Sequence, residues 1–525
     1  MKKLATKTLM AGVLTGLGTF SADAQSPKIV VGIVVDQLRT DYLEQLRPYF
    51  GDSGFKRLMT DGLYLTDVDF RNTVADAPAS TAVVYTGAWP SANGVAAAER
   101  LEGTLKKNVP TLASDPSKLK FDFSPENIRL STIADEFYIT NGNLSKIYSI
   151  GGDPQVAVIA AGHAGTGAVW MDEANARWTT PAYYGQPPTT VGNRNRINPL
   201  SSRITASYWK PLHAASHYAA GRAWTEGDFN YGFSSGNRDA YTRFKASPLF
   251  NTEATDVAIE LLKSIKNSSL GQSNLVNVAY SLAPVGFDYD GDSRPELVDS
   301  YMRLDADIAR LFETLDRDYG RENTLVFLSS TGYATEPQIP EQDAKIPTGE
   351  VTLKKVESLL NAFLSASYGN ADYVALIKDG KLFLDTKEIE RKGIDMKALR
   401  TEAKEFLLKM GGVADAITID EAMRSDSRRA QDMALGIDPK NTPDLFLFFN
   451  PGWTVTDDNA FPAVSHKVRL SSPSTPAFIL GPDIEADRIT TRVDATVLAP
   501  TIASAINIRA PNGAASKPLT IKTNK

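Results

Sequence analysis

Buried-strand patterns alternate with helical patterns along most of the chain. A continuous apolar run at 28–35 ends in Asp36, which is typical of a strand buried on both faces of a parallel sheet. Apolar runs at 274–282 and 324–329 have the same composition. The alternation predicts an α/β fold in which helices sandwich a doubly wound, mostly parallel sheet. The helices predicted from apolar residues at helical spacing cover 257–265 and 298–315.

The pattern changes between residues 350 and 440, where it predicts a smaller inserted α+β lobe. A hairpin is predicted at 373–384, because Asp379-Gly380 separates two alternating runs and favours a type I′ turn. Predicted helices flank the hairpin, one starting at Leu353 and one covering 396–410. We expect this lobe to lie over the ligand-binding edge of the main sheet.

Buried-strand composition returns after the lobe. The predicted elements there are strands at 445–449 and 477–480 and a closing helix at 494–506. The expected domains are therefore a main α/β domain of 25–350 and 440–525 and a lobe of 350–440.

The first 24 residues have the pattern of a secretory signal peptide. Lys2, Lys3 and Lys7 precede or flank an apolar stretch at 9–20, and Ala22-Asp23-Ala24 is a cleavage site of the A-x-A type. The apolar stretch is shorter than the roughly 20 residues that a membrane span needs. We therefore expect cleavage after Ala24, a periplasmic or secreted protein, and no transmembrane segment after cleavage.

Composition narrows the classes of partner. The 525-residue chain has 56 Lys and Arg against 62 Asp and Glu, a net charge of −6, and no basic stripe, so a nucleic-acid partner is not expected. It has no Cys, so an exported protein of this sequence is stabilised without disulfides.

Six segments in a characteristic order resemble the alkaline phosphatase superfamily, in particular secreted single-chain alkaline phosphatases allied to type I phosphodiesterases and nucleotide pyrophosphatases. The resemblance implies an alkaline-phosphatase-like fold, two zinc ions held by Asp and His at the C-terminal edge of the sheet, and a Thr or Ser nucleophile. The matching segments are 30–43, 85–95, 160–172, 297–316, 345–349 and 494–508.

Most positions that the resemblance marks as catalytic carry other residues here. Asp36 matches the first metal-binding Asp of the family, and the nucleophile position is Ala77. A family His and Asn fall on Asn93 and Ala98, and the phosphate-binding Lys-x-Arg falls on Asp153 and Gln155. The remaining ligand positions fall on Leu282 or Ala283, Phe287, Thr331, Gly332 and Ala344.

The histidine count supports the loss of the metal site. The chain has four His, and none of them lies within a few residues of Leu282, Thr331 or Ala344. A two-zinc site of the family type therefore cannot be assembled from this sequence, and no cofactor is expected. The four are His163, which we interpret as a residue that stabilises the fold, and His213, His217 and His466.

Three weaker sites stay open as alternatives. Thr73 and Asp76, with Ser80 and Thr81 nearby, could form a rebuilt nucleophile loop. His213 and His217 are four residues apart and could bind one metal if their segment is helical. The acidic segment 288–299 is similar to a calcium loop, although it lacks the glycine at the sixth position.

The sequence thus predicts an exported pseudo-phosphatase with a binding, scaffold or regulatory role, whose partner is an unidentified protein or small molecule. The alternative is an active phosphohydrolase, either a phosphate monoesterase or a phosphodiesterase, that would need zinc and a rebuilt site. The cluster of Asp36, Asp76 and Asp153 also predicts weak phosphate binding, because an anion would meet like charge there.

Overall fold

The structure is a computed structural model of the whole chain. It describes residues 26–71, 76–102, 107–214, 217, 229–234, 239–268, 271–282, 293–335, 347–458, 464–469 and 472–522.

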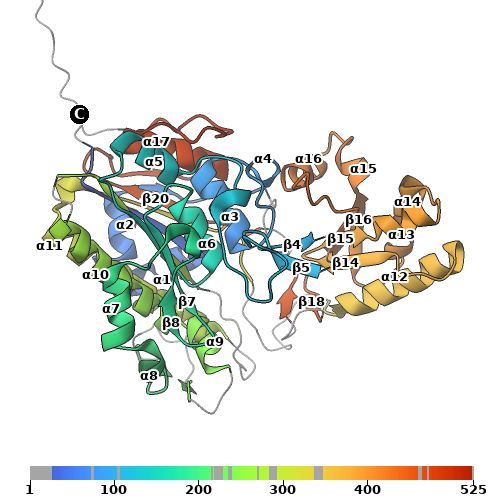
Figure 1. Cartoon of the computed structure of the whole chain (residues 1–525), viewed down its shortest axis with the longest axis horizontal. Helices are drawn as coiled ribbons and strands as arrows, with labels where there is room; N and C mark the ends of the chain where they lie inside the picture. The colour runs from blue at the N-terminus through green and yellow to red at the C-terminus, as the bar shows by residue number, and fades with distance from the viewer. Residues whose placement is uncertain are drawn as a thin grey trace, which may run out of the picture.

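A nine-stranded sheet forms the centre of the larger part of the molecule (Figure 1). Its strand order is β21-β2-β20-β12-β1-β11-β6-β7-β8, and the five strands from β12 to β7 run parallel to one another. The antiparallel pairs join β20 to β12 and to β2, and β8 to β7. The strands are β1 (Ile29–Asp36), β2 (Leu63–Leu65), β6 (Ile147–Gly151), β7 (Gly167–Asp172), β8 (Arg177–Thr179), β11 (Asn274–Ser281), β12 (Thr324–Ser330), β20 (Ala477–Leu480) and β21 (Asp487–Ile489).

Helices cover both faces of this sheet, which confirms the predicted doubly wound α/β fold. Strand β1 is buried on both sides: Val31, Ile33 and Val35 pack in one hydrophobic cluster, and Val30 and Val34 pack in the other. The first cluster contains α1 (Thr40–Leu46), α2 (Phe55–Asp61), α10 (Pro248–Ser268) and α11 (Arg294–Asp318). The second contains α3 (Ala77–Thr86), α5 (Ile133–Asn141), α6 (Pro154–Ala161) and α17 (Leu498–Ala505).

Gly32 in the middle of β1 shows how closely the helices pack on the sheet. A Cβ atom at this position would lie 2.3 Å from Oδ1 of Asn277 and 2.8 Å from the hydroxyl of Tyr85. These two groups form a buried hydrogen bond, in which the Tyr85 hydroxyl donates to Asn277 Oδ1 at 2.8 Å. A larger residue at position 32 would therefore separate a buried polar pair.

A second sheet, of four strands in the order β14-β15-β17-β16, forms the core of the lobe at the right of Figure 1. Helices α12 (Leu353–Tyr368) and α14 (Met396–Leu407) pack on it in a separate hydrophobic cluster. Asp379 and Gly380 both have positive φ angles, 49° and 70°, as the predicted type I′ turn requires. The strands are β14 (Val374–Lys378), β15 (Lys381–Leu384), β16 (Val413–Thr418) and β17 (Leu445–Phe449).

Strand β17 corrects one expectation from the sequence. Its apolar composition placed it with the main domain, but it pairs with β15 and β16 in the lobe sheet. Composition indicates that a strand is buried, and it does not indicate which sheet buries it. The predicted closing helix is a 3₁₀ turn at Ala495–Val497 followed by α17.

The remaining elements are short. No helix among the described residues combines the length and hydropathy that a membrane crossing needs. The short strands are β3 (Val68–Asp69), β4 (Glu99–Glu102), β5 (Lys107–Pro110), β9 (Tyr208–Trp209), β10 (Tyr231–Gly232), β13 (Glu350–Thr352), β18 (Thr454–Asp457), β19 (Val464–Lys467) and β22 (Val493–Asp494). The further helices are α4 (Pro90–Asn93), α7 (Thr189–Ile197), α8 (Leu200–Ile204), α9 (Ala240–Lys245), α13 (Thr386–Arg391), α15 (Ile419–Ala422) and α16 (Arg428–Leu435).

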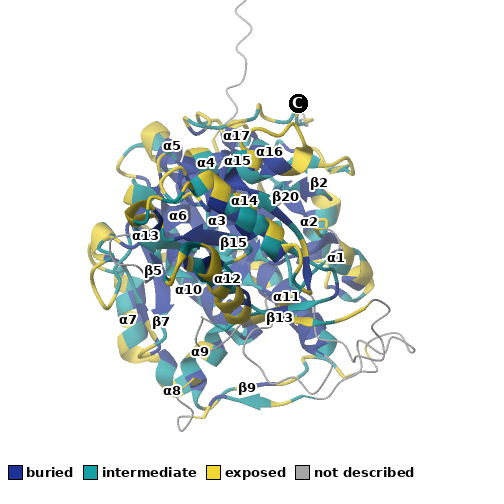
Figure 2. Cartoon of the chain, turned by 90° about the vertical axis from the view of Figure 1, so that its right-hand side faces the viewer, coloured by how far each residue is buried: buried dark blue, intermediate teal, exposed yellow. Residues whose placement is uncertain are grey.

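Helix α12, helix α13 and the lobe strand β15 project over the middle of the main domain when the molecule is viewed from the lobe side (Figure 2). Two hairpins lie where the lobe meets the main domain. The β14–β15 hairpin belongs to the lobe, and the β4–β5 hairpin belongs to the main domain (Figure 1).

Candidate functional site

Asp36 ends the central strand β1, where the parallel strands β11 and β12 also end. Three hydroxyl groups donate hydrogen bonds to its carboxylate. The hydroxyls of Tyr333 and Thr331 reach Oδ1 at 2.6 and 3.0 Å, and that of Ser281 reaches Oδ2 at 3.3 Å. Asp36 therefore lies at the predicted sheet edge, with neutral donors around its carboxylate.

Burial raises the pKa of Asp36 to about 6, and the charge of Asp76 adds to the increase. The three hydroxyl donors act in the opposite direction, because they stabilise the carboxylate. The pKa of the Tyr333 phenol is also shifted. Burial and the charges of Asp36, Asp76 and Asp153 raise it well above the usual value. All three carboxylates therefore act electrostatically on one tyrosine, a residue that no sequence motif indicated.

The backbone after β12 leaves no room for a ligand side chain at Gly332. This residue has a φ angle of 75°, and a Cβ atom there would lie 2.1 Å from the ring of Phe70. The neighbouring Thr331 donates to Asp36 and accepts a hydrogen bond from the Gln37 N–H at 2.9 Å. The two positions that the resemblance associates with an Asp-His pair thus carry a threonine hydroxyl and a glycine against which the Phe70 ring packs.

Asp76 and Ala77 form the start of helix α3. Asp76 is the N-cap: Oδ1 accepts from the Ala79 N–H at 3.0 Å, and Oδ2 accepts from the Ala98 N–H at 2.7 Å. Burial raises the pKa of Asp76, and these two donors and Lys381 oppose the increase. Ser80 and Thr81 donate to backbone carbonyls of their own helix, at Asp76 and Ala77, so helix geometry accounts for the polar groups of this turn.

Asp153 begins helix α6 in the same way. Its Oδ1 accepts from the N–H groups of Gln155 and Val156 at 2.7 and 3.2 Å. Burial raises the pKa of Asp153, and the charge of Lys245 opposes the increase. Gln155 bridges two loops, because its amide donates to the Ala98 carbonyl at 2.9 Å and accepts from a backbone N–H at 2.9 Å. The pair that stands at the phosphate-clamp positions therefore supports the fold.

Two further positions identified by the resemblance also have structural roles. Asn93 is buried: it donates to the Ala88 carbonyl and accepts from the Val95 N–H, both at 2.8 Å. Leu282 is buried directly after β11. The predicted positions outside the described residues are Thr73, Ala283, Phe287 and Ala344.

His163 stabilises the fold, as the sequence analysis interpreted it. Its Nδ1 lies 3.0 Å from Oδ2 of Asp135, and its Nε2 lies 3.1 Å from the carbonyl of Ile128. Hydrogen bonding to Asp135 raises the pKa of His163, and burial partly opposes this. The two ring nitrogens thus link α5 and the loop before it to the loop after α6.

The other histidines do not meet at the strand edge in the described structure. The rings of His213 and His217 stack at 4.1 Å between centroids, and His213 lies in a bend instead of an α-helix. His466 lies on β19 beside Asp379, whose charge opposes the lowering of its pKa by burial.

The acidic segment is partly helical. Glu296 and Asp299 lie on α11, where Asp299 accepts from the Trp209 indole N–H and from Arg303, both at 2.7 Å. Residues 283–292, including Asp288, lie outside the described residues. The described part of the predicted calcium loop is therefore a helix start whose carboxylates have protein partners.

Among the residues that the structure describes at the strand edge, the donor set does not fit two zinc ions. Within the described part of the chain, no three His, Cys, Asp or Glu side chains converge in an arrangement that could hold a metal ion. Zinc prefers four donors with nitrogen or sulfur among them. Asp36 instead has hydroxyl partners, and Phe70 fills the space beside Gly332.

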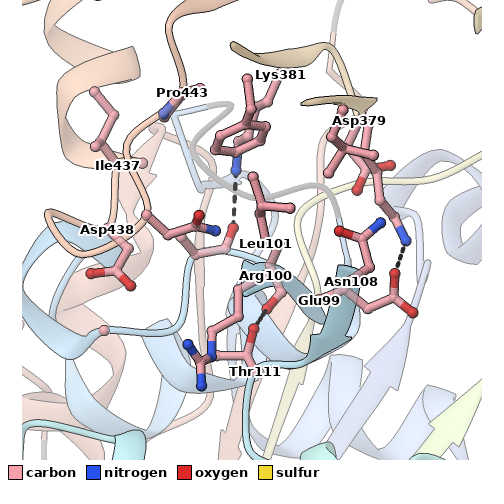
Figure 3. Close-up of a pocket in the computed structure, with 18 residues that line it drawn as sticks. Glu99, Arg100, Leu101, Asn108, Thr111, Asp379, Lys381, Ile437, Asp438 and Pro443 are labelled. Atoms are coloured by element: carbon pink, nitrogen blue, oxygen red, sulfur yellow. Dashed lines mark hydrogen bonds and ion pairs between the residues drawn. The ribbon is translucent and has the colours of Figure 1, made fainter. Parts of the chain in front are cut away.

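The lobe adds residues to this region that sequence reasoning missed. Lys381 on β15 donates to the Ala96 carbonyl at 3.1 Å, and Lys378 on β14 forms an ion pair with Glu99 on β4 (Figure 3). A cleft of about 520 Å³, which includes its open mouth, lies between these hairpins and the segment around Asp438. The Asp379-Gly380 turn predicted the hairpin, but no sequence pattern indicated what the hairpin contacts.

The nine-stranded, mostly parallel sheet with helices on both faces is an alkaline-phosphatase-like α/β fold. The family model for type I phosphodiesterase / nucleotide pyrophosphatase matches residues 30–469, and the chain belongs to this family.

The chain aligns with relatives over almost its full length. The chain is 26% identical to alkaline phosphatase PafA of Elizabethkingia meningoseptica, with 98% of this chain and 99% of that protein covered. It is 27% identical to a Myroides odoratus protein named calcium-transporting ATPase, with 95% of each covered. The crystal structure of wild-type PafA superimposes with a TM-score of 0.79 over 94% of this chain and 98% of that chain, at 24% identity.

Proposed function

We propose that this chain is a catalytically degenerate member of its family, a pseudo-phosphatase that has a binding, scaffold or regulatory role. The environment of Asp36 carries this proposal. A carboxylate that binds zinc needs free oxygen lone pairs and further nitrogen or oxygen ligands beside it. Here Tyr333, Thr331 and Ser281 donate to those lone pairs, and the position after Thr331 is a glycine packed against Phe70.

The nucleophile position supports the same proposal. Ala77 has a methyl group where phosphoryl transfer needs a hydroxyl, and Asp76 is engaged by two backbone N–H groups. Loss of metal and nucleophile together removes charge stabilisation and covalent catalysis, which are worth many powers of ten in rate at about 1.4 kcal/mol per tenfold.

Turnover of aryl phosphate monoesters and diesters with added Zn²⁺ tests the proposal. We expect the rate to equal that of a buffer blank and to be the same for the wild type and for Asp36→Ala. Zinc-dependent turnover that Asp36→Ala abolishes would instead establish the alternative, an active phosphohydrolase with zinc as cofactor. The names of PafA and of alkaline phosphatase PhoV favour this alternative.

Weak phosphate affinity follows from the same arrangement. The charge of Asp76 raises the pKa of Asp36, and the charge of Asp153 raises the pKa of Asp76, so an anion at this edge would meet like charge. One like-charge contact at about 4 Å costs roughly 4 kcal/mol at an effective dielectric constant near 20. Calorimetry with inorganic phosphate at neutral pH is expected to show no heat of binding, and a micromolar affinity would contradict the proposal.

We also propose that the protein is exported. The Lys-rich start, the apolar stretch and the A-x-A site support cleavage after Ala24, so the partner is met in the periplasm or outside the cell. We propose a protein or small molecule as that partner and no nucleic acid, because the net charge is −6. N-terminal sequencing of the exported protein should begin at Gln25, and an intact Met1 in the cytoplasm would contradict export.

A further inference from the structure

A second cleft lies beside helices α2 and α11 of the main domain. It has a volume of about 410 Å³, or about 940 Å³ with its open mouth. Small-molecule sites in proteins usually have volumes of about 300–1,000 Å³. The two helices form walls of this cleft, and both lie on the side of the main domain that faces away from the lobe (Figure 1). The cleft is therefore large enough for a small organic ligand, and it is separate from the lobe junction.

This cleft is also distant from Asp36. Thr324 and Val326, in the first half of β12, line the cleft. Asp36 lies at the other end of the sheet, one residue beyond the point where Val35 pairs with Ser330. A strand rises about 3.3 Å per residue, so the first and last residues of β12 are about 20 Å apart. A ligand in this cleft therefore does not depend on the chemistry at the strand edge.

The inner part of the cleft is apolar. Phe312 and Leu315 on α11 and Val326 on β12 line it, and all three belong to the hydrophobic cluster that α2 and α11 cover. Leu480, at the end of β20, lines the same cleft and is only partly buried. Contact with these side chains removes apolar ligand surface from water, which favours a ligand with an aromatic or aliphatic body.

One wall of the cleft is a network of paired charges. Arg57 on α2 donates two hydrogen bonds to the carboxylate of Asp316, at 2.8 and 2.9 Å. The Arg57 guanidinium also lies 5.0 Å from the centroid of the Phe312 ring. Arg321 donates from Nε to the same carboxylate at 3.1 Å. This wall is held by the protein itself, so a ligand does not have to order it on binding.

Carboxylates outnumber cations at the cleft. Two arginines face three carboxylates there, and two of these, Asp61 and Glu322, are exposed. Within the part of the chain that the structure describes, their hydrogen-bond partners are neutral: the Thr60 hydroxyl at 2.9 Å and the Asn323 amide at 3.0 Å. Helix α2 ends at Asp61 and helix α11 at Asp318, so the negative ends of two helix dipoles add to the potential. The cleft therefore favours a cation over an anion.

We propose that this cleft binds a small organic cation, a molecule with an aromatic or aliphatic body and a protonated amine. The body packs against Phe312, Leu315 and Leu480, and the amine lies toward Asp61 and Glu322. The protein then has a ligand site that does not use the carboxylates of the strand edge, and this site does not require the loss of catalysis there.

Three indole compounds that differ in charge test the proposal: tryptamine carries an ammonium group, tryptophol is neutral and indoleacetate is anionic. Saturation-transfer NMR and calorimetry with the purified protein measure their dissociation constants. We expect a Kd of about 1 mM or below for tryptamine, at least about threefold tighter than tryptophol and tenfold tighter than indoleacetate, because each exposed carboxylate adds a modest attraction. Equal or reversed affinities, or no binding of tryptamine, would overturn the proposal.

Charge variants connect this preference with the cleft. Asp61→Asn combined with Glu322→Gln replaces two carboxylates by amides of the same shape, and it should reduce the preference for tryptamine over tryptophol to less than about twofold. Glu313→Gln is the matched control, because Glu313 is an exposed carboxylate on α11 that does not line the cleft. An unchanged preference in the double variant, or an equal loss in the control, would overturn the proposal.

A variant that fills the cleft tests where the body of the ligand lies. Leu480→Trp should weaken tryptamine binding by at least about tenfold, because the larger ring occupies the apolar part of the cleft. Leu359→Trp, at an exposed leucine on α12 of the lobe, should leave the affinity unchanged. Equal affinities of these two variants for tryptamine would overturn the proposal. Because Asp61 and Glu322 are exposed, their amide variants decide the question even if Leu480→Trp does not fold.

Discussion

Two carboxylates in this molecule, the buried Glu253 and the partly buried Asp36, are stabilised in opposite ways. Glu253 on α10 accepts paired hydrogen bonds from Arg194 at 2.7 and 2.8 Å and from Arg203 at 2.6 and 2.8 Å. These arginines lower the pKa of Glu253 even though burial acts to raise it. Asp36 receives its hydrogen bonds from hydroxyl groups, and burial raises its pKa to about 6.

The comparison shows which carboxylate the protein holds in its ionised form. Guanidinium groups hold Glu253 ionised in a network that joins α7, α8 and α10, where it has a structural role. At the strand edge, neutral donors replace the cations that a metal centre would supply, so Asp36 is half-protonated near pH 6.

The largest effect is expected at Glu253, the carboxylate that arginines hold ionised. Arg194→Met should lower the free energy of unfolding by about 3–5 kcal/mol, because it leaves Glu253 with one arginine and removes the partner of Glu260. Urea unfolding followed by fluorescence measures this loss. Arg196→Met, an exposed arginine on the same helix, is the control and should change stability by about 0.5 kcal/mol or less. Equal losses of stability in the two variants would contradict the role given to the Arg194–Glu253 pair.

The next effect concerns Asp36 and has a defined pH dependence. Because folding raises its pKa from 3.8 to about 6, the stability tied to protonated Asp36 is complete below pH 3.8 and is lost as pH rises through 6. Asp36→Asn keeps the acceptor for Tyr333 and Thr331 and removes this loss. Relative to wild type, the variant should gain roughly 3 kcal/mol between pH 4 and pH 7, at about 1.4 kcal/mol per pKa unit.

Urea unfolding across this pH range measures the gain. Asp52→Asn, at an exposed site, serves as the control and should show no such pH-dependent gain. A constant difference between Asp36→Asn and wild type would show that Asp36 is ionised throughout, and the contrast with Glu253 would then fail.

The smallest effect concerns His163, whose cation is partly exposed. Its pKa is raised by Asp135, so the stability from this pair is complete below pH 6.5 and is lost as pH rises through the higher folded pKa. His163→Gln should cost about 0.5–1 kcal/mol at pH 6, since solvent screens a ring that is 36% exposed, and the deficit should shrink above pH 8. Calorimetric melting at both pH values tests the sign, and a deficit that grows with pH would contradict it.

The sequence predicted the sheet, its parallel core and the lobe hairpin, because local patterns specify these features. The run at 28–35, the position of Asp36 at its end and the Asp379-Gly380 turn each depend on a few neighbouring residues. It did not predict that β17 joins the lobe sheet, because strand pairing depends on residues far apart in the chain.

The candidate site likewise contains residues that the local sequence predicts and residues that it does not. Asp36 and Asp76 could be placed at the strand edge from the segments that contain them, and the substitution at Ala77 is visible in the sequence. The contacts of Tyr333 and Lys381 could not be predicted. They join residues that lie 297 and 285 positions apart in the chain, respectively. Long-range packing of this kind has no local signal.

Zinc binding tests the central claim most directly. Protein purified without chelator should be analysed for metal content and then titrated calorimetrically with Zn²⁺ at pH 7.5, beside Asp36→Asn. We expect no stoichiometric zinc and no heat that distinguishes the two proteins. Two equivalents of zinc in the wild type, with binding lost in Asp36→Asn, would contradict it and would show that the strand edge is a working metal centre.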